Sequence, residues 1–121
     1  MIYREEILEH WQNPQNFGKM RGADLVIDQV NPLCGDQLKF FIKFDDSRSR
    51  IKNVRFTGNG CAISVAATSI LSEAIKGKKV EVVNKITGAD VLKFLGGSVA
   101  PARLKCAFLA LEVIKKLKVE D

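Results

Sequence analysis

The sequence lacks any apolar segment close to the roughly 20 residues needed to cross a bilayer, so we expect no membrane-spanning helix. Its first six residues lack the apolar core of a secretory signal peptide. Cysteine is scarce and odd in number, with three residues, which argues against a disulfide framework. These absences predict a soluble cytoplasmic protein whose cysteines are free thiols or metal ligands.

The charge is unbalanced towards lysine and arginine, with a formal net charge of +5 at pH 7. The two densest lysine runs, at residues 76–79 and 115–118, follow apolar helical patterns, where cations complement the helix dipole. No aromatic residues alternate with these lysines, as they do in proteins that bind single-stranded nucleic acid. The charge therefore favours a protein partner with an acidic patch over a nucleic acid.

The length and the patterning predict a single domain that spans residues 1–121. Apolar alternation predicts three strands with short connections: one from Leu25 to Asn31-Pro32, then residues 38–44 and 51–58. Helical spacing predicts helices over residues 3–10, 63–74, 88–95 and 104–117, with Gly77 as a C-terminal stop. Strands followed by helices predict an α+β fold, with a three-stranded antiparallel sheet packed against helices in two layers.

The three cysteines stand in different local settings. Cys34 lies between two predicted strands, Cys61 follows Gly-Asn-Gly at the start of a predicted helix, and Cys106 lies near the start of the last helix. Asp36 adds a carboxylate, which makes an S3O set for a metal that accepts thiolates, iron or zinc. The neighbouring glycines predict a solvent-reachable site that passes on sulfur or metal rather than storing it.

We also expect reactive thiols at this site. The start of a helix favours the thiolate form of Cys61 and lowers its pKa, because the helix N-terminus stabilises negative charge. Lys105 would do the same for Cys106 if its ammonium group points inward.

Three motifs occur in order along the chain: Asn31-Pro32-x-Cys34-Gly35-Asp36, Gly58-x-Gly60-Cys61-x-Ile63-Ser64 and Arg103-x-Lys105-Cys106. Together with the segment from Tyr3 to Gly18, they resemble the U-type iron–sulfur cluster scaffold family (IscU, SufU and the N-terminal domain of NifU). The resemblance covers residues 3–117. It implies the same α+β fold and a non-enzymatic scaffold. On this scaffold a [2Fe-2S] cluster is assembled from an iron donor and the sulfur of a cysteine desulfurase, then transferred to apo iron–sulfur proteins.

The resemblance also implies a role for each residue of the site. Cys34, Cys61 and Cys106 match the cysteines that ligate the cluster, and Asp36 matches an aspartate linked to cluster release and zinc ligation. Cys106 matches the position that receives persulfide sulfur. A cluster bridging two chains, and hence a homo-oligomer, stays open.

The chain departs from each subgroup of this family. Lys105 stands where many IscU-type members have histidine, which makes Asp36 the better fourth ligand. Lysine at position 105 is typical of SufU-type chains. However, residues 77–102 are too short to contain the inserted segment of those chains. The Leu-Pro-Pro-Val-Lys segment recognised by a dedicated Hsp70 chaperone is replaced by residues 99–103, so the resemblance gives that chaperone no support as a partner.

Two other functions stay open. The first is a zinc-bound sulfur acceptor, similar to SufU, that stimulates a cysteine desulfurase. The second is a structural zinc domain that mediates protein contacts. His10, the only histidine, is far from the cysteines in sequence and is better explained by helix capping or surface packing than by metal ligation.

Overall fold

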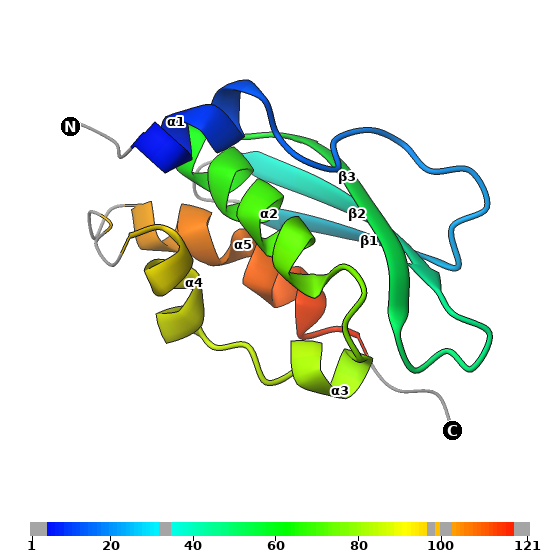
Figure 1. Ribbon diagram of the computed structural model, residues 1–121. Coiled ribbons are helices and arrows are strands. Elements are labelled where there is room, and N and C mark those ends of the chain that lie inside the picture. The colour runs from blue at the N-terminus through cyan, green and yellow to red at the C-terminus, as the bar shows by residue number, and fades with distance from the viewer. Residues whose placement is uncertain (1–4, 32–34, 97–98, 100–102, 118–121) are drawn as a thin grey trace.

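Three strands form a sheet in the part of the chain that the structure describes. The computed structural model describes residues 5–31, 35–96, 99 and 103–117. Within them, β1 (Leu25–Asn31), β2 (Asp36–Phe44) and β3 (Ile51–Asn59) form an antiparallel sheet in the order β1-β2-β3 (Figure 1). The predicted three-stranded antiparallel sheet is therefore confirmed, and β2 begins two residues earlier than predicted.

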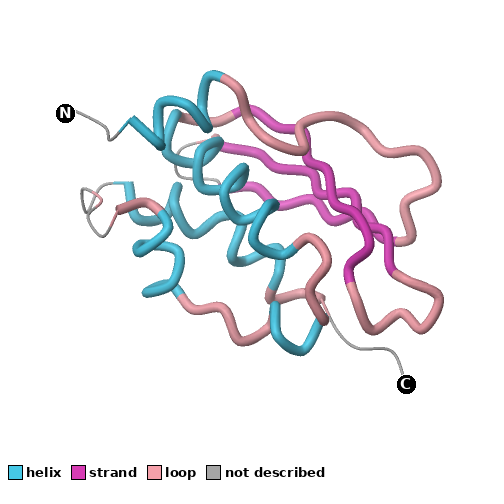
Figure 2. The backbone as a smooth tube through the Cα atoms, viewed as in Figure 1, coloured by secondary structure: helices cyan, strands magenta, loops and turns pink. Residues whose placement is uncertain are grey.

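Helices cover one face of this sheet, as Figures 1 and 2 show. They are α1 (Glu5–Gln12), α2 (Ala62–Ile75), α3 (Val80–Val83), α4 (Gly88–Phe94) and α5 (Leu104–Ile114). The predicted two-layer α+β fold is confirmed. The single turn of α3 was missed, because four residues are too few to show a helical period. None of the helices in the described part of the chain is long and apolar enough to span a membrane.

The core forms where one side of the sheet meets the helices. Leu38, Phe40 and Ile42 alternate along β2 towards the helices and are at most 1% exposed, as the period of two requires. Phe40 stacks on Phe56 of β3, with ring centroids 6.1 Å apart. Phe41 points to the opposite face of the sheet, where neighbouring side chains leave it only 8% exposed.

Helices α2 and α5 are buried on more than one side. The apolar residues whose spacing predicted the last helix do not all face the core. Leu111, Ile114 and Leu117 are buried, but Leu104 and Phe108 are half-buried. Small residues of α5 are buried as well, because this helix contacts α2, α4 and β1. A helix with several packing partners loses the single apolar stripe that sequence patterns reveal.

A polar network holds the start of the chain on α2. The Nδ1 atom of His10 lies 2.7 Å from Oγ of Ser69, and the backbone N–H of Gln15 donates to the same oxygen at 2.8 Å. The side-chain amide of Asn16 donates to Oγ of Ser72 at 3.0 Å. Buried serines on α2 thus fix α1 and the loop that follows it, and His10 has a packing role.

The same loop covers the outer edge of β3. The N–H of Phe56 donates to the carbonyl of Asn16 at 2.9 Å, and the N–H of Gly18 donates to the carbonyl of Phe56 at 2.8 Å. Phe17 packs edge-to-face on Phe56, with centroids 5.4 Å apart. These contacts satisfy backbone groups that an open edge strand would leave exposed.

Candidate metal and sulfur site

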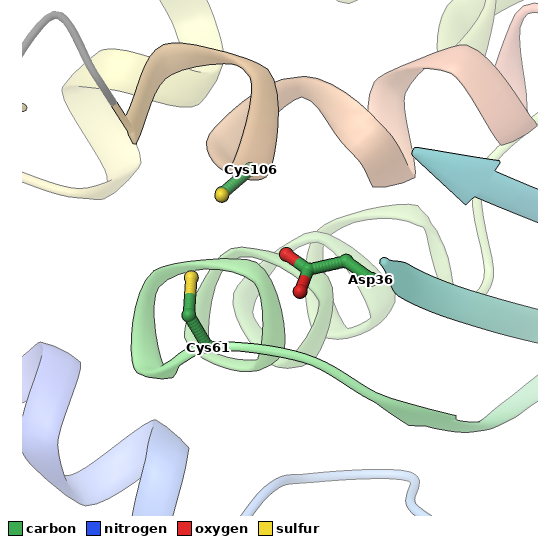
Figure 3. A group of neighbouring side chains, drawn as sticks. All are labelled: Asp36, Cys61 and Cys106. Atoms are coloured by element: carbon green, nitrogen blue, oxygen red, sulfur yellow. The ribbon is translucent and has the colours of Figure 1, made fainter. Parts of the chain in front are cut away.

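Three side chains from different elements meet at one end of the sheet. Asp36 is the first residue of β2, Cys61 is the N-cap of α2, and Cys106 lies in the first turn of α5. One carboxylate oxygen and the two sulfur atoms all lie within 4.8 Å of one another. Figure 3 shows the three side chains pointing towards a common centre. Cys34 lies outside the described residues.

Close packing between strands positions Asp36 and Cys61. Gly58 of β3 pairs with Leu38 of β2, and a Cβ atom at Gly58 would collide with the carbonyl oxygen of Gln37. Gly60 likewise leaves no room for a side chain beside Asp36. Glycine therefore lets the chain pass tightly by the start of β2 before it turns into α2.

Ser64 of α2 closes the same corner. Its hydroxyl donates to the carbonyl oxygen of Cys61 at 3.0 Å, and the side chain is 1% exposed. This bond fixes the first turn of α2, where backbone groups lack helical partners. Ser64 matched one of the three motifs, but its positioning role was not anticipated.

The site is more enclosed than the glycines suggested. Asp36 is 6% exposed and Cys106 is 3% exposed, whereas Cys61 is half-buried. Within the described part of the chain, Oδ2 of Asp36 is buried without a hydrogen-bond partner. Because an unpaired buried carboxylate oxygen is costly, its position beside two thiols indicates a place for a cation. Two thiolates and a carboxylate are suitable ligands for zinc or iron.

The pKa of Cys106 is raised from an ordinary value of 9.0 to about 12. Burial of the thiol is the largest cause, and hydrogen bonding and charge at Cys61 and then at Asp36 add to it. This contradicts the expectation of a lowered pKa at Cys106, because Lys105 is exposed and burial dominates. A cation bound between the three groups would favour the thiolate instead.

Zinc binding is therefore expected to release protons and to strengthen with pH. The thiol of Cys106 is protonated at neutral pH, so each zinc ion must displace that proton. Because of this one proton, the apparent zinc affinity should rise about tenfold per pH unit. Calorimetric titration at pH 6 to 8, in buffers of different ionisation enthalpy, measures this release. A pH-independent affinity without proton release would contradict Cys106 as a ligand.

The raised pKa of Cys106 also determines how the stability of the fold changes with pH. A pKa raised on folding stabilises the fold below the unfolded value near 9. That contribution is lost as the pH rises from 9 towards 12, where the unfolded chain releases its proton more readily. Replacing Cys106 with alanine should remove this part of the alkaline destabilisation in chemical denaturation.

Alanine at Gly60 is expected to weaken zinc binding about tenfold and to cost about 1–2 kcal/mol of stability. Its Cβ atom would collide with Oγ of Ser64 and lie 3.2 Å from Cγ of Asp36, so both side chains must move. Gly22→Ala is the control, since a Cβ there meets nothing within 4 Å although its φ of +70° strains an alanine. The control should lose stability but keep its zinc affinity. Unchanged affinity in Gly60→Ala would show that Asp36 is not held by this contact.

Two other residues were considered from the sequence, Lys105 and His10, and neither belongs to this group. Lys105 is exposed in the first turn of α5, next to Cys106 in the chain. His10 is not among the grouped ligand atoms, and its Nε2 atom lies 3.5 Å from a carboxylate oxygen of Glu73.

Comparison with known proteins places this arrangement in a family. The family model of the NifU-like N-terminal domain matches residues 2–119. This chain belongs to that family. The resemblance to U-type scaffolds is thereby confirmed.

Relatives of this chain are named either as scaffold proteins or as a sulfurtransferase. The iron–sulfur cluster assembly scaffold protein IscU 1 of Archaeoglobus fulgidus is 36% identical over 119 residues, which is 98% of this chain and 76% of that protein. The zinc-dependent sulfurtransferase SufU of Bacillus subtilis is 33% identical, over 95% of this chain and 88% of SufU. The SufU alignment runs over 132 positions, so SufU contains residues that this shorter chain lacks.

A solved structure agrees with the fold. The crystal structure of a scaffold protein for the SUF system from Fervidobacterium islandicum aligns with a TM-score of 0.80 and 26% identity, covering 93% of each chain.

Proposed function

We propose that this protein is a scaffold for the assembly of a [2Fe-2S] cluster, which it receives as iron and desulfurase-derived sulfur and passes to apo-proteins. The observation that carries the proposal is the meeting of Asp36, Cys61 and Cys106 within 4.8 Å at a buried corner. Cys34 completes the proposed ligand set. Membership of a family whose relatives are named scaffolds supports it.

Cys106 is the proposed sulfur acceptor. In the transfer step, its sulfur attacks the outer sulfur of the desulfurase persulfide, the S–S bond breaks, and the desulfurase cysteine leaves as a thiol. The Cys106 thiol gives up one proton, so the products are a Cys106 persulfide and a reduced desulfurase. The leaving desulfurase thiolate takes up that proton, so the step neither consumes nor releases a net proton.

Zinc-dependent sulfur acceptance is the second candidate, supported by the lysine at position 105 and by the similarity to SufU. Both functions use the same three thiols, and they differ in what the site holds between transfers. A scaffold accumulates sulfide and iron, whereas a zinc-bound acceptor holds sulfur only as persulfide. A structural zinc domain would accept no sulfur, and its fold would be lost on chelation.

Anaerobic reconstitution with iron, cysteine and a cysteine desulfurase tests the proposal. A scaffold should develop the visible absorbance of a cluster and contain equal amounts of iron and acid-labile sulfide. The product should then activate an apo-ferredoxin. Retention of zinc with persulfide at Cys106, and no labile sulfide, would instead establish the sulfur-acceptor function.

Lys105→Gln is expected to slow persulfide formation at Cys106 about twofold without removing bound metal. Lys105 is exposed, so its charge favours the thiolate only weakly through solvent. Persulfide trapping by alkylation, across a pH series, measures both the rate and the titration of Cys106. Loss of metal with an unchanged alkylation profile would make Lys105 a ligand or a partner of one.

A further inference from the structure

The outer face of the sheet carries an open groove that the proposed cluster site does not use. Among the described residues, no helix covers this face, and Figure 2 shows the helices on the other side of the sheet. The groove has a volume of about 560 Å³. It is lined by Phe17, Lys19, Gln37, Lys39, Phe41, Thr57, Gly58 and Asn59.

The groove is positively charged. Lys19 and Lys39 line it, and none of the described residues that line it is acidic. Within the described residues, Lys39 pairs with Asp28, whose carboxylate lies 3.9 Å from its Nζ atom with both groups well exposed. Such an exposed ion pair is weak, so a carboxylate of a binding partner can displace Asp28 from Lys39. Arg55, opposite Phe41 in the neighbouring strand, adds a further cation to this side.

Apolar side chains flank these cations. Phe17, Val26 and Val30 are 47%, 47% and 49% exposed. Phe17 lines the groove, while Val26 and Val30 lie opposite Phe41 and Gln37 in the strand register. Exposed apolar groups with polar residues around them mark surfaces that contact other proteins.

The groove ends beside the candidate metal site. Gln37 directly follows Asp36, and Asn59 lies two residues before Cys61. A partner seated in the groove would therefore lie next to the strand ends that present Asp36 and Cys61. Cys106, the proposed entry point for sulfur, belongs to α5 in the helical layer instead.

We propose that this groove docks an acidic segment, with a bulky apolar side chain, of the apo-protein that receives the cluster. The inference rests on the proposed scaffold function for the identity of the partner, but the groove itself does not depend on it. Carboxylates of the segment pair with Lys19 and Lys39, and its apolar side chain packs against Phe17. Attraction between opposite charges speeds encounter and sets orientation.

Other occupants fit the groove less well. A second copy of this chain carries the same net charge of +5 and would be repelled. A single-stranded nucleic acid stacks its bases on exposed aromatic rings. Among the described residues that line the groove, Phe41 is only 8% exposed, which leaves Phe17 as the one accessible ring. An acidic protein segment uses both the cations and the isolated ring.

The test measures binding of the full chain to a fluorescently labelled plant-type apo-ferredoxin, an acidic protein, by anisotropy at 50 and 300 mM NaCl. The groove variant is Lys19→Glu with Lys39→Glu. The matched control is Lys85→Glu with Lys93→Glu, which makes the same change of net charge at exposed lysines in the helical half of the chain. Thermal melting checks that both variants fold.

The groove variant should bind about tenfold more weakly at 50 mM NaCl, and this difference should shrink at 300 mM. The control should change less than twofold, and Phe17→Ala should weaken binding at both salt concentrations. Equal weakening by both double variants would overturn the proposal, because it would reduce the effect to net charge. Equally tight binding of a 12-nucleotide oligouridine that competes with ferredoxin would also overturn it.

Because apo-ferredoxin binding needs no cluster, the outcome is separable from the scaffold function. A chain that assembles no cluster but binds through the groove would contradict only the scaffold function. A chain that assembles a cluster but is indifferent to Lys19 and Lys39 would contradict only the docking surface.

Discussion

Replacing either Cys61 or Cys106 with alanine is expected to abolish tight metal binding, lowering the apparent zinc affinity at least about 100-fold. Each substitution removes one of the two described thiols in a group with a single carboxylate, and no other described cysteine, histidine or carboxylate joins that group. Cys34→Ala is expected to have the same effect, as the third thiol of the proposed set. Zinc competition titration and the absorbance of the reconstituted cluster measure the loss.

The fold should survive these substitutions. Cys61 is half-buried, so alanine there should change stability little. Cys106 is buried in the core, and its truncation should cost about 1 kcal/mol. Chemical denaturation monitored by circular dichroism, with chelator present, separates this cost from the loss of bound metal.

Ser64→Ala is the matched control for the cysteine series. Its hydroxyl is buried against Cys61 but is not one of the grouped ligand atoms, so the variant disturbs the same corner without removing a ligand. It should keep a cluster, although with reduced stability. A cysteine variant that kept the full cluster spectrum would have to be removed from the ligand set.

The sheet could be predicted because apolar residues alternate along the first part of the middle strand, β2. Leu38, Phe40 and Ile42 face the helices, and the short connections leave the chain little choice but to pair consecutive strands. The helical layer was harder to read. On α2, buried positions include Ser64, Thr68, Ser69 and Ser72, which a hydrophobic pattern assigns to the surface.

These four hydroxyl side chains are buried because each has a hydrogen-bond partner. Thr68 donates to the carbonyl of Ser64 at 2.6 Å, and Ser72 donates to that of Ser69 at 2.7 Å. Ser69 and Ser72 also bind the loop after α1. Repeated hydroxyl residues at spacings of three and four on one helix were the available signal, since such side chains can bond to the preceding turn.

The meeting of Asp36, Cys61 and Cys106 was expected, but the burial around them was not. Spacings of 27 and 45 residues between cysteines do not determine proximity, so the resemblance between motifs supplied the grouping that the structure shows for Asp36, Cys61 and Cys106. Local sequence also could not reveal that α5 buries Cys106. Burial depends on the packing of α5 against α2 and the sheet, and it reverses the expected direction of the thiol pKa.

Asp36→Ala is expected to lengthen the lifetime of a bound cluster several-fold and to slow its transfer to apo-ferredoxin by a similar factor. A carboxylate is a harder ligand than a thiolate and binds iron less firmly, so Asp36 gives the site one exchangeable position. The direction of the effect follows the resemblance to U-type scaffolds. Decay of the visible absorbance in air, and the rate of ferredoxin activation, measure the two quantities.

The same substitution should hardly weaken the fold. Asp36 is 6% exposed, and its Oδ2 atom has no hydrogen-bond partner among the described residues, so its removal relieves the cost of an unpaired buried oxygen. We expect the free energy of unfolding to stay within about 1 kcal/mol of the wild-type value. Asp28→Ala, which removes an exposed carboxylate from the outer face of the sheet, is the control and should leave lifetime unchanged.

Asp36→Asn separates ligation from charge at this position. Asparagine keeps the shape of the side chain but loses the negative charge and the strong metal affinity of a carboxylate, so it should lengthen the cluster lifetime as alanine does. If both variants kept the wild-type lifetime and transfer rate, Asp36 would be an ordinary residue at the start of β2. If asparagine behaved as wild type and alanine did not, the side chain would act through packing, because only alanine removes its volume.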